Sequence, residues 1–184
     1  MRRRVLVLLL LAALAAVATR AAAPGQARPF ARQRPVICGK ERWLIKTLQD
    51  RPTLLSARVT TVANLVGLPR PTQLPATRLP FERRIYSLLA AVTLVKAESD
   101  QDLHLVLEDG GQHIIAEASN PDACTATATN YRRKQMRDAR SAVRLCAQAR
   151  VVGVGFWDFK HGQTGVAPNA IELHPILGFA CLTP

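Results

Sequence analysis

Hydrophobic and polar positions in the second half of the chain alternate as they do in β-strands. Apolar and β-branched residues run from Ile85 to Lys96, and a strict alternation of apolar and polar residues follows from Gln101 to Glu108. Successive side chains of a strand point to opposite faces, so both patterns predict strands. Asp109-Gly110-Gly111 tolerates positive φ angles and predicts a hairpin turn. Three more strands are predicted over residues 113–118, 151–159 and 170–177.

The hydrophobic period changes to that of a helix between Tyr131 and Ala147. An apolar stripe recurs there at spacings of three and four residues, at Met136, Ala139, Val143 and Cys146. We expect the helix to bury this stripe and to leave its arginines in solvent, namely Arg133, Arg137, Arg140 and Arg144. The resulting order β-β-β-α-β-β is that of the OB-fold. Residues 81–184 are therefore predicted to form a mostly β, OB-fold-like five-stranded barrel with one helix.

The N-terminus has the pattern of a secretory signal peptide. Three arginines precede an uninterrupted apolar run from Val5 to Ala18, and small residues follow. The run has 14 residues, fewer than the ~20 that a membrane-spanning helix needs. We predict a signal peptide at residues 1–18 and a basic disordered lead-in at 19–37. The protein is then secreted or extracytoplasmic, without a stable membrane span after cleavage. An uncleaved anchor is the alternative.

Positive charge is concentrated in the N-terminal part of the chain, whose formal net charge is +12 overall. Residues 19–80 carry 11 basic and 2 acidic side chains, whereas residues 81–184 carry 11 of each. The part of this region that follows the lead-in is a Pro-rich N-terminal arm, residues 38–80. Two hypotheses remain for the arm. It contacts a polyanion, or it packs as a linker by way of Trp43, Leu44 and Ile45.

Four cysteines in an exported protein predict two disulfides, because an oxidising compartment lets thiols pair. Cys124 and Cys146 bracket the predicted helix, and Cys38 and Cys181 lie near the two ends of the folded part. We favour bridges between Cys124 and Cys146 and between Cys38 and Cys181 among the three possible pairings. A four-cysteine zinc site is disfavoured, because the chain has no Cys-x-x-Cys pair.

Several segments resemble a family of exported bacterial proteins to which no activity is assigned. They are DLHLVL at 102–107, IAE at 115–117, GFWDFKHGQTGVAPN at 155–169 and IELHP at 171–175. The resemblance covers roughly residues 40–180 and implies an OB-fold-like domain. A weaker similarity at the level of the fold is to staphylococcal-nuclease-like domains. Where those domains carry Asp-Thr-Pro-Glu after the third strand, this chain has Asn-Pro-Asp at 120–122.

Polar residues of three predicted strands share one face of the barrel. Side chains two apart on a strand project together, so Asp102 joins His104, and Glu172 joins His174. Glu117 lies opposite its apolar neighbours by the same rule. In an OB barrel the third strand lies between the second and the fifth, so these five residues are expected to converge on the outer face, which is the usual ligand side.

These residue types suit a metal or an acid–base site. Two imidazoles and a carboxylate match the ligands of a divalent metal, which makes His104, Glu117 and His174 the candidate metal ligands. Glu172 or Asp102 is the candidate catalytic base. The candidate ligand-binding residues are His104, Glu117, His174, His161 and Asp158, the last two beside the loop between the final strands. The alternative is that these polar residues simply face water.

Local charge favours a cation over a nucleic acid at this face. Residues 82–122 hold 8 acidic groups against Arg83, Arg84 and Lys96, and such a surface repels phosphate backbones unless a cation intervenes. We therefore predict a secreted OB-fold-like domain that binds an unidentified ligand, with a divalent metal as the candidate cofactor. The alternatives are a secreted divalent-metal-dependent phosphodiesterase or nuclease, and a structural or protein-interaction module.

Overall fold

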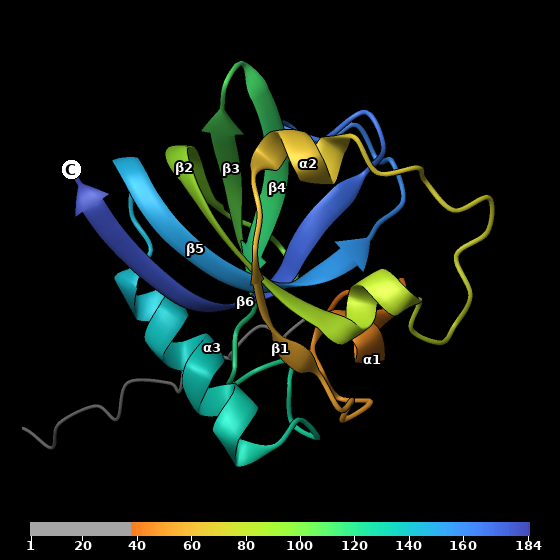
Figure 1. Ribbon diagram of the computed structural model, residues 1–184. Coiled ribbons are helices and arrows are strands. Elements are labelled where there is room, and N and C mark those ends of the chain that lie inside the picture. The colour runs from red at the N-terminus through yellow and green to blue at the C-terminus, as the bar shows by residue number, and fades with distance from the viewer. Residues whose placement is uncertain (1–37) are drawn as a thin grey trace, which may run out of the picture. The chain divides into compact units, whose positions relative to one another are not determined.

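Figure 1 shows the fold of the chain in a computed structural model that describes residues 38–184. The signal peptide predicted at 1–18 and the basic lead-in predicted at 19–37 lie outside the described residues. Within residues 38–184, no helix combines the length and the apolar character that crossing a membrane requires.

Six strands form one mixed sheet in a ring-like arrangement (Figure 1). They are β1 (Leu55–Val59), β2 (Arg84–Ala97), β3 (Leu103–Asp109), β4 (Gln112–Ala118), β5 (Cys146–Trp157) and β6 (Ile171–Thr183). The pairing order is β1-β2-β3-β4-β6-β5, and β2 also pairs with β5, so the sheet closes on itself. The architecture is mostly β and OB-fold-like, as predicted.

The sequence predicts five strands, and the structure adds β1 as a sixth. Every residue of β1 is exposed, so no alternation of buried and exposed positions marks this strand in the sequence. β1 pairs in parallel with the start of β2, where Arg58 lies opposite Tyr86. β5 begins earlier and β6 ends later than predicted, at Cys146 and Thr183, because the two strands pair antiparallel along this extension.

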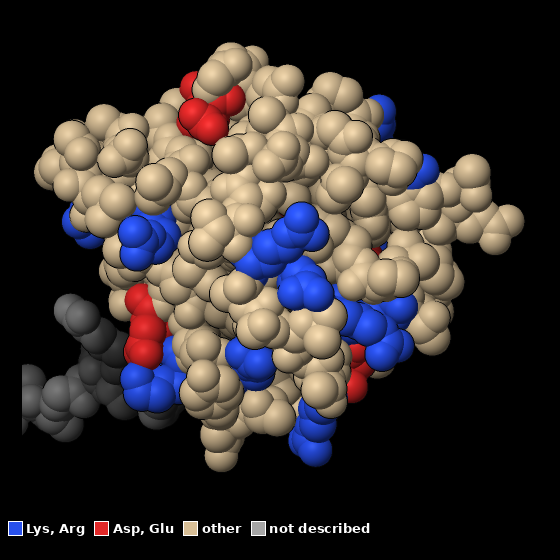
Figure 2. Space-filling view, viewed as in Figure 1, with Lys and Arg blue, Asp and Glu red and all other residues tan. Residues whose placement is uncertain are grey.

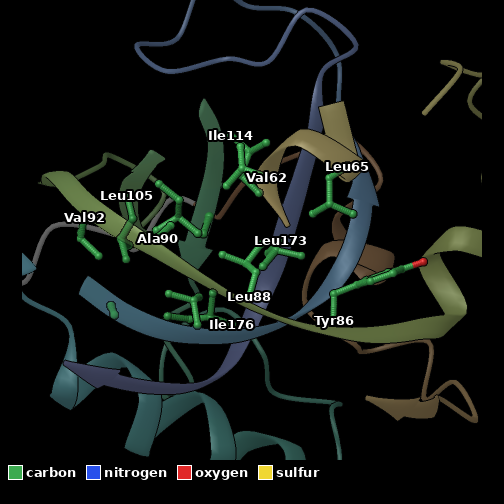
Figure 3. Packing of buried hydrophobic residues seen from close by; sticks show 14 of the residues in the cluster. Val62, Leu65, Tyr86, Leu88, Ala90, Val92, Leu105, Ile114, Leu173 and Ile176 are labelled. Carbon is green, nitrogen blue, oxygen red and sulfur yellow. The ribbon is translucent and has the colours of Figure 1, made fainter. Parts of the chain in front are cut away.

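The main hydrophobic core lies between the strands of the ring (Figure 3). Leu88, Leu105, Ile114, Leu173 and Ile176 come from four different strands, and each is at most 1% exposed. Burying a side chain of this size stabilises the fold by about 1.5–3 kcal/mol relative to leaving it in water. A short helix, α2 (Val62–Val66), packs over β3 and β4 and adds two further buried residues to this core.

The predicted helix is α3 (Asn130–Ala142), which packs mainly against β6. Met136 and Ala139 are buried, as the apolar stripe predicts. The helix ends before residue 147 because the following residues enter β5. Two arginines depart from the predicted solvent-facing stripe. Arg133 is half-buried and donates a hydrogen bond to the backbone carbonyl of Pro121. Arg140 is half-buried and donates a hydrogen bond to the backbone carbonyl of Ala118.

The disulfides join Cys38 to Cys124 and Cys146 to Cys181, so the predicted pairing is wrong. α3 stands between Cys124 and Cys146, and a helix of 13 residues spans about 20 Å, which separates the cysteines at its two ends. Cys146 instead lies at the start of β5, beside the end of β6 that carries Cys181. Disulfides persist in oxidising compartments, so both bridges are consistent with an extracellular location.

The N-terminal arm packs against the barrel and contains α1 (Trp43–Lys46) and α2, and a 3₁₀-helix, η1 (Pro80–Arg83), leads from it into β2. Ile45 is buried and Trp43 is half-buried, which fits the packing hypothesis. Leu44 does not fit that hypothesis, because 59% of its surface is exposed.

Three arginines of the arm make internal contacts instead of forming a basic surface. The Arg42 guanidinium donates to both carboxylate oxygens of Glu82, at 2.6 and 2.7 Å. Arg78 donates to both oxygens of Asp50, at 2.7 and 2.8 Å. Arg70 donates to two backbone carbonyls of the β5–β6 loop. Since these guanidiniums already have acceptors, they are not free to bind the polyanion proposed for the arm.

Candidate functional site

Strand register brings the predicted site residues together. His104 of β3 lies directly opposite Glu117 of β4 in an antiparallel pair. Ile115 of β4 lies beside Glu172 of β6 in a parallel pair, so two residues further along both strands Glu117 comes beside His174. These side chains alternate with residues of the main core, which places them on the outer side of the ring.

The predicted exposure of these side chains is wrong, because the outer face is covered. The exposed fractions are 0% for Asp102, 1% for His104, 4% for Glu117, 1% for Glu172 and 0% for His174. The arm residues 38–50, called the cover segment below, approach this face through Lys46, whose ammonium lies 2.9 Å from Asp158 Oδ2. The β5–β6 loop covers His104 by way of the Thr164 carbonyl. The hypothesis that these residues face water is therefore excluded.

A continuous chain of polar contacts runs through the buried face. His174 Nε2 lies 3.2 Å from Asp102 Oδ2, and His174 Nδ1 lies 3.1 Å from Glu117 Oε2, although the latter contact lacks the alignment of a hydrogen bond. His104 Nδ1 lies 3.3 Å from Glu117 Oε1, and His104 Nε2 lies 2.8 Å from the Thr164 carbonyl. Glu117 therefore stands between the two imidazoles.

Burial and neighbouring charges determine the protonation of the side chains in this series of polar contacts. Burial disfavours an ionised carboxyl, but His174, His104 and Lys46 nevertheless lower the pKa of Glu117 to about 2. Burial also disfavours a charged imidazole, yet contacts with Glu117 and with the Thr164 carbonyl raise the pKa of His104. Glu117 is thus a permanent anion near neutral pH, and it attracts a positive charge onto its neighbours.

Three residues of the site are missing from the sequence-based prediction, Lys46, Glu98 and Ser119. Burial lowers the pKa of Lys46, but the surrounding carboxylates outweigh this effect, with Glu172 first, and raise the pKa. No local pattern in the arm marks this lysine. Ser119 Oγ lies 3.1 Å from His174 Nε2. Its position could have been predicted, because Ser119 follows Glu117 by two residues and side chains two apart in extended chain share a face. Ser119 is fully buried, which argues against a role as a nucleophile.

Three oxygens of two buried carboxylates accept no hydrogen bond from the described residues. They are both oxygens of Glu172 and Oδ1 of Asp158, whose other oxygen accepts from Lys46. Burial raises the pKa of Glu172 well above its ordinary value, and the negative charges of Glu117 and Asp158 raise it further, whereas Lys46 opposes them. A cation brought to this face would therefore relieve an electrostatic cost that the protein bears without it.

Replacing Glu172 by glutamine is expected to change how stability depends on pH. The folded-state pKa of Glu172 is raised above the 4.5 of an unperturbed carboxyl. Below pH 4.5 the carboxyl is protonated in both the folded and the unfolded state, so its contribution to stability is fully retained. As pH rises from there towards the folded-state pKa, the free energy of unfolding falls by about 1.4 kcal/mol per pH unit. In urea unfolding with a chelator present, the stability of Glu172→Gln relative to the wild type should therefore increase as pH rises above 4.5. A pH-independent difference, like that expected for the exposed Glu108→Gln, would contradict this.

The predicted metal ligands divide between two clusters that share Glu117. Glu98, His104 and Glu117 form one, and Asp102, Glu117 and His174 form the other, with the ligand atoms of each cluster within 4.8 Å of one another. Among the described residues no cluster combines His104 with His174, which departs from the predicted metal triad. The first cluster has the half-exposed Glu98 as a member, whereas the second is fully buried.

A cleft of about 340 Å³ reaches the first cluster. Its walls are the cover segment, the β2–β3 turn and the start of the β5–β6 loop, and Glu98, Glu117, Asp158 and His161 are among its lining residues. A neighbouring hollow of about 200 Å³ is lined by Glu98, His104 and Thr164. The structure thus places Asp158 and His161 at the cleft, and their roles in ligand binding stay predictions.

Comparisons with known proteins yield low structural similarity. No family model and no curated protein matches this chain. A Leishmania major protein assigned as an aspartyl-tRNA synthetase has a TM-score of 0.45 and 12% identity over 68% of this chain and 21% of its own. An Entamoeba histolytica aspartyl-tRNA synthetase has a TM-score of 0.39 and 13% identity, covering 72% and 26% of the two chains. The chain spans about a quarter of the length of these synthetases.

Proposed function

We propose that the protein is an exported OB-fold-like binding domain that takes a divalent transition-metal ion at Glu98, His104 and Glu117. In this proposal β2, β3, β4, β5 and β6 are the five strands of the OB barrel, and α3 is its helix. Glu98, His104 and Glu117 are the metal ligands, and His174 and Asp102 are positioning residues behind Glu117.

The position of the cleft supports a ligand site. OB-folds bind their ligands on the face of the second and third barrel strands, between the loop that joins the first two strands and the loop that joins the last two. In this chain those elements are β3, β4, the β2–β3 turn and the β5–β6 loop, and all of them contribute residues to the cleft or to the neighbouring hollow. A bound ion would occupy the place where this fold usually holds its ligand.

The orientation of His104 is the observation that carries the proposal. Its Nε2 faces the Thr164 carbonyl, which can only accept a hydrogen bond, so this nitrogen carries a proton. The other nitrogen, Nδ1, faces two carboxylates, 3.3 Å from Glu117 and 3.9 Å from Glu98. Metal-binding histidines are held in this way, with the second ring nitrogen donating to a carbonyl. One imidazole and two carboxylates suit Zn²⁺ or Mn²⁺ better than Ca²⁺, which prefers oxygen ligands alone.

The surrounding charge favours a cation over a polyanion. Five carboxylates line the cleft, from Glu41, Glu98, Asp100, Glu117 and Asp158, against two lysines. Neither Asp102 nor Glu172, the two candidate bases, is among the residues that line the cleft, which favours metal binding over metal-dependent hydrolysis.

A metal titration tests the proposal. We expect the purified mature protein to bind one Zn²⁺ or Mn²⁺ in calorimetry more tightly than Ca²⁺, and to show a raised melting temperature when loaded. Glu98→Gln, at a half-exposed position, and His104→Gln should weaken binding by at least the roughly 10–100-fold that outer-shell changes cost. Glu108→Gln, at an exposed hairpin position, is the matched control and should bind as the wild type does.

Two outcomes of this experiment would contradict the proposal. One is the absence of binding by the wild type, and the other is an equal affinity in all three variants. The loaded protein is also incubated with plasmid DNA, RNA and a model phosphodiester. Cleavage that is lost in Glu98→Gln would replace metal binding alone by the metal-dependent phosphodiesterase hypothesis.

A further inference from the structure

A further hollow of the domain is an apolar groove of about 800 Å³, lined by residues from β1, α2, η1 and the start of β2. Leu65, Tyr86 and Trp157 line it and are each at most 7% exposed. The ring of Phe81 stacks on Tyr86 with the ring centroids 4.7 Å apart. This volume lies within the range of about 300–1,000 Å³ that small-molecule sites occupy. No lining residue is shared with the metal cleft.

The groove carries positive charge and, among the described residues, no negative charge. Arg58 of β1 and Arg84 of β2 line it, and no Asp or Glu does. Neither guanidinium forms an ion pair within residues 38–184, in contrast to those of Arg42 and Arg78 in the N-terminal arm. Figure 2 shows basic side chains near the middle of the face on which β1 lies in Figure 1. Arg58 is exposed, and Arg84 uses only one of its guanidinium N–H groups, towards the Ser56 carbonyl at 3.5 Å, so both side chains retain donors for an anionic ligand.

Tyr86 connects the apolar and the charged parts of the groove. In Figure 3 its ring stands at the edge of the core, and its hydroxyl points away from Leu88 and Leu173. Burial raises the pKa of the Tyr86 hydroxyl, and the positive charges of Arg84 and Arg58 oppose that rise, so both guanidiniums act on this oxygen. A hydroxyl donor therefore lies within the field of the two arginines.

We propose that this groove binds an amphiphilic carboxylate, of the class of medium-chain fatty acids. The carboxylate lies on Arg58 and Arg84, since a guanidinium fork matches the two carboxylate oxygens. The hydrocarbon chain packs along the groove on Leu55, Leu68 and Phe81, whose exposed or half-exposed side chains it removes from water. A nucleic acid fits this groove less well, because its repeated phosphates need a basic track longer than two arginines.

Dodecanoate below its micellar concentration is the probe, with dodecyltrimethylammonium as the cation of equal chain length. Calorimetry on the folded mature protein should show dodecanoate binding more tightly by roughly tenfold or more, because charge-assisted hydrogen bonds form only with the anion. Arg58→Gln and Arg84→Gln should each weaken dodecanoate binding by a similar factor of roughly ten. Arg83→Gln is the matched control, because Arg83 is exposed, adjacent in sequence and absent from the groove.

The proposal is overturned if dodecanoate and dodecyltrimethylammonium bind equally tightly. It is also overturned if Arg83→Gln weakens dodecanoate binding as much as Arg58→Gln and Arg84→Gln do. A second experiment measures co-sedimentation of the protein with phosphatidylcholine vesicles that contain dodecanoate. Association with such vesicles without binding of free dodecanoate would overturn the proposal in favour of a membrane surface. Circular dichroism of each variant confirms that it is folded. None of these substitutions touches the metal cleft, so the result is independent of the proposed metal function.

Discussion

Replacing Glu82 by alanine is expected to lower the free energy of unfolding by about 3–5 kcal/mol, the usual cost of breaking a buried ion pair on one side. Glu82 is fully buried, and its two oxygens accept hydrogen bonds from Arg42 at 2.6 and 2.7 Å. The same carboxylate accepts the backbone N–H groups of Leu79, at 2.8 Å, and Trp157, at 3.0 Å. Removing it leaves these two backbone donors without their acceptor. It also leaves the largely buried guanidinium without a counter-charge, with only the carbonyls of Pro75, Thr77 and Trp157 as acceptors.

Urea unfolding of three variants tests this expectation. The double variant Arg42→Leu/Glu82→Leu should recover part of the loss suffered by Glu82→Ala, because no uncompensated charge then remains buried. Glu108→Ala, at an exposed hairpin position, should change stability by no more than about 0.5 kcal/mol. A loss for Glu82→Ala as small as that of Glu108→Ala would show that this ion pair does not hold the arm to the barrel.

The elements that could be predicted from the sequence are those whose apolar residues recur at a regular spacing. Five strands have alternating or continuous apolar patterns, and α3 has a stripe at helical spacing, so local rules locate them. The convergence of His104, Glu117 and His174 was also predictable, because side-chain parity and the barrel order place neighbouring strands side by side. β1 has no such pattern, since it is exposed throughout, and it forms only because β2 offers it an edge.

The burial of the site was not predictable from local patterns. It depends on contacts between residues far apart in sequence, such as Arg42 with Glu82 and Lys46 with Asp158, which are separated by 40 and 112 positions. An arm rich in proline and arginine has the composition of a solvated linker, and nothing in its sequence shows which carboxylates its charges will meet. The proposed role of Glu98 as a metal ligand was missed for a related reason, because this residue lies in a turn, where parity rules do not apply.

Loss of the Cys38–Cys124 bridge is expected to have the widest effect on the site. This bridge joins positions 86 residues apart, and in the chain-entropy model its removal costs about 4–5 kcal/mol. It also anchors the cover segment to the turn that follows β4. Next to it, the Trp43 indole N–H and the Gln49 side-chain amide both donate to the Cys124 carbonyl, each at 3.1 Å. Without the bridge only hydrogen bonds hold the segment against this turn, namely these two and the two that Gln49 Oε1 accepts from the backbone N–H and the hydroxyl of Thr127.

The Cys146–Cys181 bridge provides the comparison, because it joins positions only 35 apart and lies at the ends of β5 and β6. Its removal should cost about 1 kcal/mol less in the same model. Amide hydrogen exchange distinguishes the effect of one bridge on the cover segment from that of the other. Cys38→Ser/Cys124→Ser should speed exchange at the amides of Ile45 and Lys46, which bond to the Arg42 carbonyl, whereas Cys146→Ser/Cys181→Ser should not. Equal exchange in both variants would mean that Arg42 and Lys46, through their carboxylate partners, hold the cover segment without help from the disulfide.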